Sequence, residues 1–413
     1  MLPHENTVVM KFGGSSLADT DKIRTVARLV ADRHVAGENI VVVVSAQGKT
    51  TDGLMKMAHE VSPNPSKREL DMLLTVGERS SMALLSMAIA DLGHQAISLT
   101  GSQCGIITND NHFNARIIDV KPVRILDELD KGHIVIVAGF QGMSYKKEIT
   151  TLGRGGSDTT AVALAAALDA RWCEIYSDVD GVYTADPRVV DPFHLMELSY
   201  DDMMQMAYRG AKVLNFHAVE FARRKQITVY ARATAGGRET LVRQPALELG
   251  RTVLAVAGCD HLVGLVTASL SETSDLLERL SANHVEIQYL LARPDGAGVL
   301  VLNPVTAPDW RAAAPDGVHV EDLFSVSVIG RSIGFENRML TQALSLAASC
   351  AAEVFCVEAN PSHLTFYCRK EKGAALGSAA LPGAALPSAA LPSAALTSAA
   401  LTAAFHKTFV TPR

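Results

Sequence analysis

The stretch that decides the fold is Thr7-Val8-Val9-Met10-Lys11-Phe12-Gly13-Gly14-Ser15-Ser16, an apolar run that ends in two glycines. A second apolar run, Ile40–Ser45, is almost entirely valine, and a helical pattern over Asp19–Arg33 separates the two runs. Near-continuous runs of this kind are typical of strands that are buried on both faces of a parallel sheet. The opening of the chain therefore predicts a strand, a helix and a second, parallel strand.

The same alternation continues outward from this unit. Further strands are expected at Ile134–Phe140, Arg171–Tyr176 and Ile227–Ala231. Helical patterns cover Thr51–His59, Lys67–Leu92, Asp158–Leu168 (with Ser157 placed to cap it), Tyr200–Arg209 and Val213–Lys225. Alternation of strands and helices predicts the α/β class, a mostly parallel sheet sandwiched by helices.

The elements become shorter after residue 251. We expect strands at Val263–Leu270, Val285–Ala292, Gly298–Asn303, Phe324–Ile329, Ala352–Glu358 and His363–Arg369, and helices at Ser274–Asn283 and Glu336–Ser349. Two successive rounds of this order predict two small α+β modules. The expected domains are therefore 1–245, 252–320 and 321–413.

A low-complexity tract of Ala, Leu, Pro and Ser interrupts the last domain at 373–403. Its prolines recur as Pro382, Pro387 and Pro392 and exclude a helix there, and we interpret the tract as a disordered repeat expansion. The prolines then stop, so Ala394–Phe409 can form an amphipathic helix.

Composition excludes several classes of protein. The 413 residues are 48% hydrophobic and 20% charged, with 38 basic and 44 acidic side chains and a net charge of −6. A mildly acidic chain argues against nucleic acid or an anionic membrane as the main partner. No uninterrupted apolar run suits a membrane span, and Met1–Asn6 does not resemble the start of a signal peptide. Six scattered cysteines without a CxxC pair favour reduced thiols, no metal site and a cytoplasmic location.

Three stretches carry groups suited to binding anions. Lys11 and the glycines after it form a strand-to-helix turn that can cradle a phosphate. Thr151–Thr160 holds Arg154 among glycines, where it can bind a carboxylate bidentately. Ser177–Arg188 follows a strand and contains Tyr183, which can stack on an adenine; its Asp-Gly can equally be a simple turn. Neither a Walker loop nor a dinucleotide fingerprint is complete in the chain.

Taken together and in this order, Lys11–Ser16, Thr151–Thr160 and Ser177–Arg188 resemble the three signatures of the aspartate kinases, in the amino-acid kinase superfamily. Ser45-Ala46, Thr51-Asp52, Gly77-Glu78-Arg79 and Gly210–Leu214 also match, and the likeness spans about residues 5–245. More loosely, the rest resembles two regulatory ACT modules. The resemblance implies ATP-dependent phosphorylation of the side-chain carboxylate of L-aspartate to 4-phospho-L-aspartate, which opens lysine, threonine and methionine synthesis.

The resemblance also implies roles for individual residues. The catalytic positions are Lys11, Asp158 and Lys212; the ATP-binding positions are Lys11, Gly13, Gly14, Ser177, Asp178, Tyr183, Arg188, Lys212 and Val213; the aspartate-binding positions are Ser45, Thr51, Glu78, Arg154 and Ser157. The N–H groups of both glycines are expected beside the phosphoryl group, and Glu78 is expected to pair with the substrate ammonium. Further implications are Mg²⁺ with the ATP, lysine or threonine as effector at the ACT modules, and a homodimer or higher oligomer.

Two other classes of function stay open. One is an amino-acid kinase with another acyl, carbamoyl or nucleotide acceptor, and the other is a non-catalytic amino-acid sensor. Glu78 and Arg154–Asp158 favour aspartate as the acceptor, whereas Lys11, Asp158 and Lys212 argue against a sensor. A carboxylate acceptor is already ionised at pH 7, so the absence of a Ser-His-Asp or Cys-His set is no obstacle.

Overall fold

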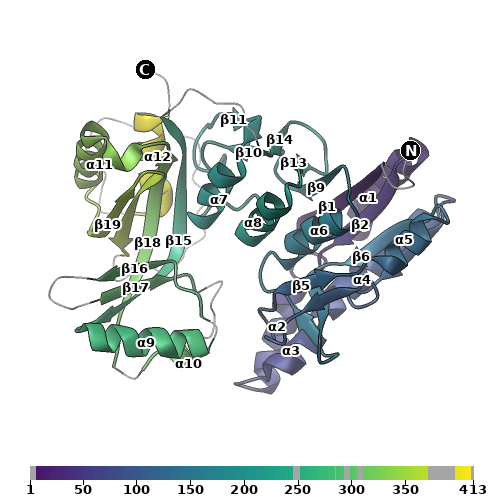
Figure 1. The fold of residues 1–413 in the computed structure, drawn as a ribbon. Coiled ribbons are helices and arrows are strands. Elements are labelled where there is room, and N and C mark those ends of the chain that lie inside the picture. Colours follow the sequence, from purple (N-terminus) through teal and green to yellow (C-terminus); the bar gives the residue numbers. More distant parts are fainter. Residues whose placement is uncertain are drawn as a thin grey trace. The chain divides into compact units, whose positions relative to one another are not determined.

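The structure, a computed structural model, describes residues 6–244, 252–283, 285–292, 298–304, 310–315, 317–370 and 396–410. The chain divides into two compact units, whose elements are labelled in Figure 1. The first comprises Met1–Val182, His194–Tyr208 and Lys212–Leu249, and the second comprises Tyr183–Phe193, Arg209–Ala211 and Gly250–Arg413.

The first unit is built on an eight-stranded sheet in the order β12-β14-β13-β9-β1-β2-β6-β3. Its strands are β1 (Thr7–Phe12), β2 (Asn39–Val44), β3 (Ala96–Leu99), β6 (Ile134–Ala138), β9 (Trp172–Ser177), β12 (Glu197–Leu198), β13 (Val229–Ala233) and β14 (Glu239–Val242). Neighbouring strands are parallel except for β13 and β14, which are antiparallel. The predicted mostly parallel sheet is confirmed.

A smaller sheet, which the sequence pattern did not predict, has the order β5-β4-β7-β8. Its strands are β4 (Ile106–Thr108), β5 (Ile117–Val120), β7 (Gln141–Ser144) and β8 (Ile149–Thr151), and two further short strands are β10 (Val182–Tyr183) and β11 (His194–Leu195). The last strand of this sheet leads directly into the glycine-rich stretch around Arg154.

Helices cover both faces of the large sheet. The helices of this unit are α1 (Thr20–Val35), α2 (Thr50–Val61), α3 (Lys67–Leu74), α4 (Val76–Ala90), α5 (Val123–Leu129), α6 (Gly156–Ala167), α7 (Tyr200–Tyr208) and α8 (Phe216–Lys225). Met10 and Phe12 of β1 join α1 and α4 in one apolar core. Because side chains alternate along a strand, Lys11 projects to the other face, where α6 packs.

The helix expected over Lys67–Leu92 is interrupted at Thr75, where α3 ends and α4 begins. This run, Lys67–Ala90, is long and apolar enough to cross a membrane by length and composition alone. The sequence reading had found no such stretch. Core helices pass the same test, and Leu74, Leu85 and Ile89 are fully buried in the first unit.

The second unit is built on a six-stranded sheet in the order β16-β17-β15-β18-β20-β19. Its strands, all antiparallel to their neighbours, are β15 (Val253–Thr267), β16 (Tyr289–Ala292), β17 (Gly298–Leu302), β18 (His319–Gly330), β19 (Val354–Asn360) and β20 (His363–Arg369). The two expected rounds of strand and helix therefore join in one sheet through β15 and β18.

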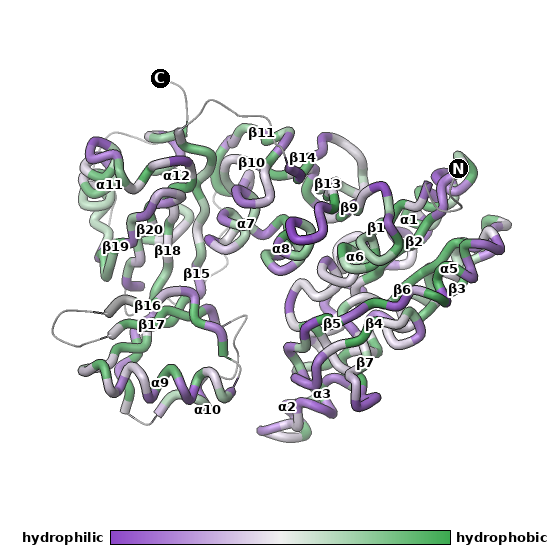
Figure 2. Tube along the Cα trace, in the orientation of Figure 1, coloured by the Kyte–Doolittle hydropathy of each residue, from purple (hydrophilic) through white to green (hydrophobic). Residues whose placement is uncertain are grey.

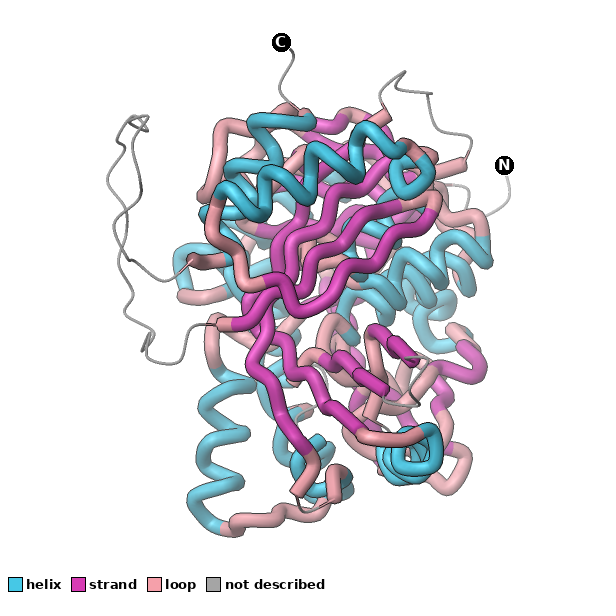
Figure 3. The backbone as a smooth tube through the Cα atoms, turned by 90° about the vertical axis from the view of Figure 1, so that its left-hand side faces the viewer, coloured by secondary structure: helices cyan, strands magenta, loops and turns pink. Residues whose placement is uncertain are grey.

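The helices of this unit are α9 (Leu270–Ala282), α10 (Trp310–Ala313), α11 (Asn337–Ser349) and α12 (Ser398–Phe409). Hydrophobic and hydrophilic stretches alternate along α9 in Figure 2, as expected for an amphipathic helix. Figure 3 shows helices lying across the strands of this sheet, where α11 and α12 share a core with β18 and β20. The helix expected over Ala394–Phe409 is thus present from Ser398, whereas most of the tract at 373–403 lies outside the described residues.

Candidate functional site

A buried ion pair joins the central strand to the helix behind it. The Lys11 Nζ lies 2.6 Å from the Asp158 Oδ1, and both side chains are 11% exposed. Asp158 stands in the first turn of α6, where the helix dipole favours a negative charge. The carboxylate thereby fixes the ammonium of Lys11 at the end of β1, next to the glycine turn.

The glycine turn is held by its own backbone. The N–H of Gly13 donates to the carbonyl oxygen of Tyr176 at 3.1 Å, so this N–H is occupied and the expectation that it faces a phosphate is wrong for this structure. A Cβ on Gly14 would stand 2.7 Å from the carbonyl oxygen of Ala46, closer than real Cβ atoms come. Gly14 is therefore needed for the close approach of this turn to the end of β2.

Two of the expected aspartate-binding hydroxyls meet at the ends of β2 and α6. The Ser45 Oγ donates to the Ser157 Oγ at 2.9 Å. The sequence predicted Ser157 as the cap of the helix, and this is wrong: the helix begins at Gly156, and the capping position is Gly155, with a φ of 73° and no side-chain cap. Ser157 is thus free of the capping role and faces Ser45.

Glu78 is a buried carboxylate in the first turn of α4. Its Oε1 accepts a hydrogen bond from the backbone N–H of Ala46 at 3.1 Å. Its Oε2 is buried and has no hydrogen-bond partner among the described residues. Burial raises the pKa of Glu78 to about 7, against the lowering effect of its backbone hydrogen bonds. An unsatisfied acceptor of this kind suits a cationic ligand group.

Arg154 is exposed on the turn between β8 and α6, flanked by Gly153 and Gly155 in the left-handed region. Its carbonyl oxygen accepts a hydrogen bond from the Asn215 Nδ2 at 3.2 Å. The Asn215 Oδ1 also caps α8 by accepting from the N–H groups of His217 and Ala218. Sequence reasoning did not name Asn215 as a site residue, although asparagine before a helical pattern is an N-cap signal.

The remaining aspartate-binding candidate, Thr51, is half-buried in the first turn of α2. Of the nucleotide candidates, Ser177 ends β9 and accepts from the N–H of Val179 at 3.1 Å, and Asp178 beyond it is exposed. Lys212 is exposed and Val213 half-buried. Both lie in the segment before α8, which begins at Phe216 and not at Val213 as the pattern predicted.

Two nucleotide candidates belong to the second unit. Tyr183 is half-buried and Arg188 is exposed, with its Nη2 lying 2.6 Å from the Asp186 Oδ2. Within the first unit, direct contacts join Lys11 to Asp158 and Ser45 to Ser157, and the chain continues from Ser45 to Ala46, whose N–H binds Glu78. These contacts lie at the neighbouring ends of β1 and β2, the edge at which parallel sheets usually bind ligands.

Comparisons with known proteins agree with this arrangement. The model of the amino acid kinase family matches residues 6–232. The aspartokinase of Mycolicibacterium smegmatis is 43% identical over 397 residues, which are 82% of this chain and 94% of the relative. The aspartokinase of Geobacillus stearothermophilus is 52% identical over 339 residues, 78% of this chain and 83% of the relative.

A solved structure has the same fold. Aspartokinase III of E. coli in complex with aspartate and ADP superimposes with a TM-score of 0.75 at 24% identity, covering 88% of this chain and 96% of that chain. The family model covers more than half of the sequence, and the mycobacterial relative is matched over nearly its whole length. This chain therefore belongs to the aspartokinases of the amino acid kinase family.

Proposed function

We propose that this protein transfers the γ-phosphoryl group of ATP to the side-chain carboxylate of L-aspartate, releasing ADP and 4-phospho-L-aspartate. The observation that carries the proposal is the buried Lys11–Asp158 pair at 2.6 Å. It places one fixed cation beside the glycine turn, at the end of the central strand. The names of the curated relatives support aspartate as the acceptor.

The chemistry requires alignment and positive charge. A carboxylate oxygen of aspartate attacks the γ-phosphorus while the bond to the oxygen bridging the β- and γ-phosphorus breaks, and ADP takes up the negative charge. The nucleophile is ionised at pH 7, so no general base is needed. Lys11 stabilises the charge on the transferring group, and Asp158 keeps the lysine oriented. Lys212 supplies a second cation from the segment before α8.

The substrate groups follow from the polar side chains around this pair. We assign the ammonium of aspartate to Glu78, whose Oε2 is buried without a partner among the described residues. The α-carboxylate is assigned to Arg154, whose guanidinium can bind it bidentately. Ser45, Ser157 and Thr51 supply hydroxyls for the remaining oxygens.

Within the first unit, the nucleotide is assigned to Gly13, Gly14, Ser177, Asp178, Lys212 and Val213. We propose that Mg²⁺ accompanies it. Among the described residues no three His, Cys, Asp or Glu side chains gather as metal ligands. Mg²⁺ is usually held by phosphate oxygens, water and one or two carboxylates, and the exposed carboxylate of Asp178 would be one of these ligands. The ion would neutralise phosphate charge.

We further propose that the second unit is regulatory, with two ACT-like modules that bind lysine or threonine and an oligomer formed by this chain. Its sheet ends in edge strands β16 and β19, and edge strands are suited to pairing with another copy. The proposed location is the cytoplasm, which the six unpaired cysteines support.

The test is an assay of ADP release with four acceptors: aspartate, glutamate, N-acetylglutamate and UMP. We expect ADP release with aspartate alone, and a product that hydroxylamine converts to a hydroxamate, as it does other acyl phosphates. Release of ADP with one of the other acceptors and none with aspartate would favour a different amino acid kinase. No release with any acceptor would contradict a catalytic function.

A further inference from the structure

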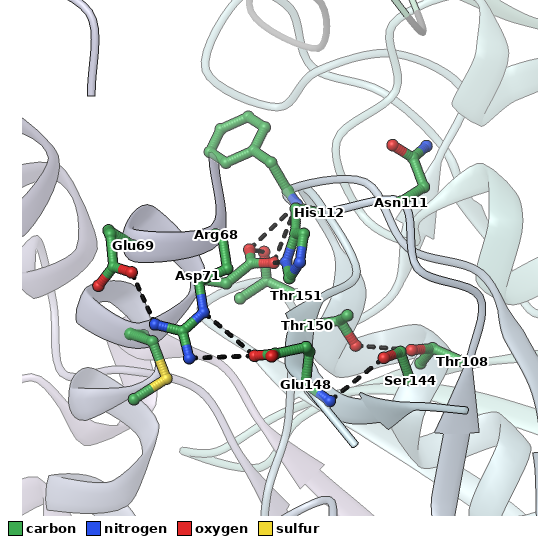
Figure 4. A network of polar contacts seen from close by, with 12 residues as sticks. Arg68, Glu69, Asp71, Thr108, Asn111, His112, Ser144, Glu148, Thr150 and Thr151 are labelled. Atoms are coloured by element: carbon green, nitrogen blue, oxygen red, sulfur yellow. Dashed lines mark hydrogen bonds and ion pairs between the residues drawn. The ribbon is translucent and has the colours of Figure 1, made fainter. Parts of the chain in front are cut away.

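A second buried carboxylate lies outside the residues assigned to the reaction. Asp71 of α3 is completely buried, and three polar groups make four contacts with its carboxylate (Figure 4). The Thr151 Oγ1 donates to its Oδ1 at 2.5 Å, and the Nδ1 of His112 lies 2.6 Å from its Oδ2. The N–H of Phe113 donates to both oxygens, at 3.0 and 3.2 Å. Buried aspartates are rare unless such partners hold them.

These contacts connect two elements that carry substrate groups. The chain continues from Asp71 through Thr75 into α4, whose first turn holds Glu78. On the other side, Thr151 ends β8, three residues before Arg154. A second hydrogen bond also joins the small sheet to the start of α4, because the Gln141 Nε2 of β7 donates to the carbonyl oxygen of Thr75 at 3.3 Å. Asp71 and its hydrogen-bond partners thus connect Glu78 with Arg154, the two side chains assigned to the ammonium and the α-carboxylate of the substrate.

The turn that carries His112 and Phe113 also supports the loop of Arg154. The N–H of Ala115 donates to the carbonyl oxygen of Thr151 at 2.8 Å. A Cβ on Gly153 would stand 2.8 Å from the Asn114 Oδ1, so the loop and the turn are closely packed. Phe113 has a φ of 72°, a conformation that a non-glycine residue adopts only when its surroundings enforce it. The hydrogen bonds to Asp71 supply that constraint.

We propose that Asp71 is a positioning residue that sets the spacing between Glu78 and Arg154, and that it thereby selects aspartate over the longer glutamate. The inference rests on the proposed function, since it assumes that Glu78 holds the ammonium and Arg154 the α-carboxylate. With both ends of the amino acid fixed, only one side-chain length brings its terminal carboxylate to the phosphoryl group. A looser spacing therefore weakens aspartate binding and admits glutamate.

Adjacent threonines provide a matched test. Thr150 and Thr151 are neighbours on β8, both are completely buried, and each hydroxyl makes a short side-chain bond. Thr151 binds Asp71, whereas Thr150 binds Thr108 at 2.6 Å. Thr151→Val removes the bond to Asp71 without changing the size of the side chain. Thr150→Val removes an equally buried bond that does not reach Asp71, and Thr151→Ser keeps the hydroxyl.

The experiment measures kcat and KM for aspartate, glutamate and ATP in the full-length protein. We expect Thr151→Val to raise the KM for aspartate about tenfold, as loss of one buried hydrogen bond to a charged group can do. Its preference for aspartate over glutamate in kcat/KM should fall, and its KM for ATP should stay within about twofold of wild type. Asp71→Asn should act in the same direction, and Thr151→Ser should restore the wild-type values. Thr150→Val should lower the melting temperature as much as Thr151→Val but leave the KM for aspartate within about twofold.

Several results would overturn the inference. Equal changes in Thr150→Val and Thr151→Val, or a change in stability without a change in the KM for aspartate, would show that Asp71 is purely structural. A wild-type enzyme that does not turn over aspartate would overturn the proposed function, and this inference with it. Normal wild-type turnover combined with unchanged aspartate–glutamate preference in Thr151→Val and Asp71→Asn would overturn the inference alone.

Discussion

Lys11 and Glu78 are both buried near the ends of the central strands, but their surroundings differ. Lys11 has Asp158 as a partner of opposite charge at 2.6 Å. Glu78 has only backbone donors among the described residues, and burial raises its pKa. A paired buried charge keeps its charge and its orientation, whereas an unpaired one is ready to gain a partner. The two residues thus suit different tasks: a fixed cation for the phosphoryl group and an acceptor for an ammonium.

Replacement of Lys11 by methionine tests the first task. Lys11→Met keeps the volume of the side chain and removes its charge, so we expect kcat to fall by roughly 10²–10³, as for other groups that stabilise developing charge. Steady-state kinetics measures this change. Because the variant leaves Asp158 buried without its partner, we expect lower stability as well.

The double variant Lys11→Met/Asp158→Asn separates these two effects. It removes the uncompensated charge, so its melting temperature should recover, while its kcat should stay low. Recovery of kcat together with stability would remove Lys11 from the mechanism.

The pH dependence of aspartate use tests Glu78. Burial raises the pKa of Glu78 to about 7 from 4.5, so the free enzyme carries a protonated, uncharged Glu78 below that pH. A neutral side chain attracts an ammonium poorly, and we expect kcat/KM for aspartate to fall as the pH drops below about 7. Glu78→Gln should raise the KM for aspartate and remove this dependence. A wild-type profile that is flat between pH 6 and 8 would contradict the assignment.

Glu78 also makes the stability of the folded protein depend on pH, in the opposite direction to kcat/KM. Between about pH 4.5 and 7 the folded state binds a proton at Glu78 that the unfolded state has released. The contribution of Glu78 to the free energy of unfolding therefore falls as the pH rises through this window and is constant above it. Urea unfolding at pH 5 and pH 8 measures the free energies of unfolding of wild type and Glu78→Gln. The stability of the glutamine variant relative to wild type should be greater at pH 8 than at pH 5.

At the scale of elements, the start of α6 shows what a local pattern can and cannot predict. The helix was predicted within two residues, because its apolar pattern is strong. The prediction for its first turn is wrong, because serine is a common N-cap. The local pattern gives no information on the contact of Ser157 with Ser45, which lies more than a hundred residues earlier in the sequence. A hydrogen bond between distant segments decides the orientation of Ser157. The glycine-rich turns around Lys11 and Arg154, by contrast, were recognisable because their glycines and charges are contiguous in sequence.

The long strands of the second unit show the same limit. The pattern predicted Val263–Leu270 and Phe324–Ile329, whereas β15 covers Val253–Thr267 and β18 covers His319–Gly330. These strands pair with each other along most of their length, with irregularities near Val253 and Cys259. Hydrogen bonds between two strands that lie some sixty residues apart in the sequence stabilise their additional residues. The local periodicity of the sequence does not reveal such pairing. The small sheet β5-β4-β7-β8 was missed for a related reason, since its strands are only three or four residues long.

Removal of Phe405 tests how much α12 contributes to the second unit. Phe405 is completely buried, and its ring lies 5.3 Å from that of Phe366 in an edge-to-face arrangement. Phe405→Ala should lower the free energy of unfolding by about 3–5 kcal/mol, the usual cost of emptying an aromatic core position. Phe335, which is 73% exposed, provides the control, and Phe335→Ala should change stability by less than about 0.5 kcal/mol. Similar unfolding curves for the two variants would exclude α12 from the core.

At the scale of the whole molecule, two short segments of the kinase half of the sequence are built into the second unit. Thr184 accepts or donates a hydrogen bond with the Nε2 of His406 at 2.9 Å, and its carbonyl oxygen accepts from the N–H of Val256. The Nη1 of Arg209 lies 2.8 Å from the Glu358 Oε2. Tyr183 directly precedes the first contact, and Lys212 follows the second by three residues. Chain continuity thus ties proposed nucleotide residues to the second unit, which the linear domain borders at 245 and 252 did not predict.

Deletion of the repeat tract tests whether the second unit needs it. The strand before the tract, β20, and the helix after it, α12, share one core through Leu364, Phe366, Leu401 and Phe405. Leu376–Pro392 lie outside the described residues, and the described part of this core comes from residues on either side of them. Because the cost of closing a loop depends only weakly on its length, removing Leu376–Pro392 should change stability by less than about 1 kcal/mol. Aspartate-dependent ADP release by the deletion variant should equal that of wild type. A large loss of turnover in soluble, folded protein would assign the tract a role beyond that of a connection, and the most direct cause would be displacement of α12 from the core that also holds Thr184 through His406.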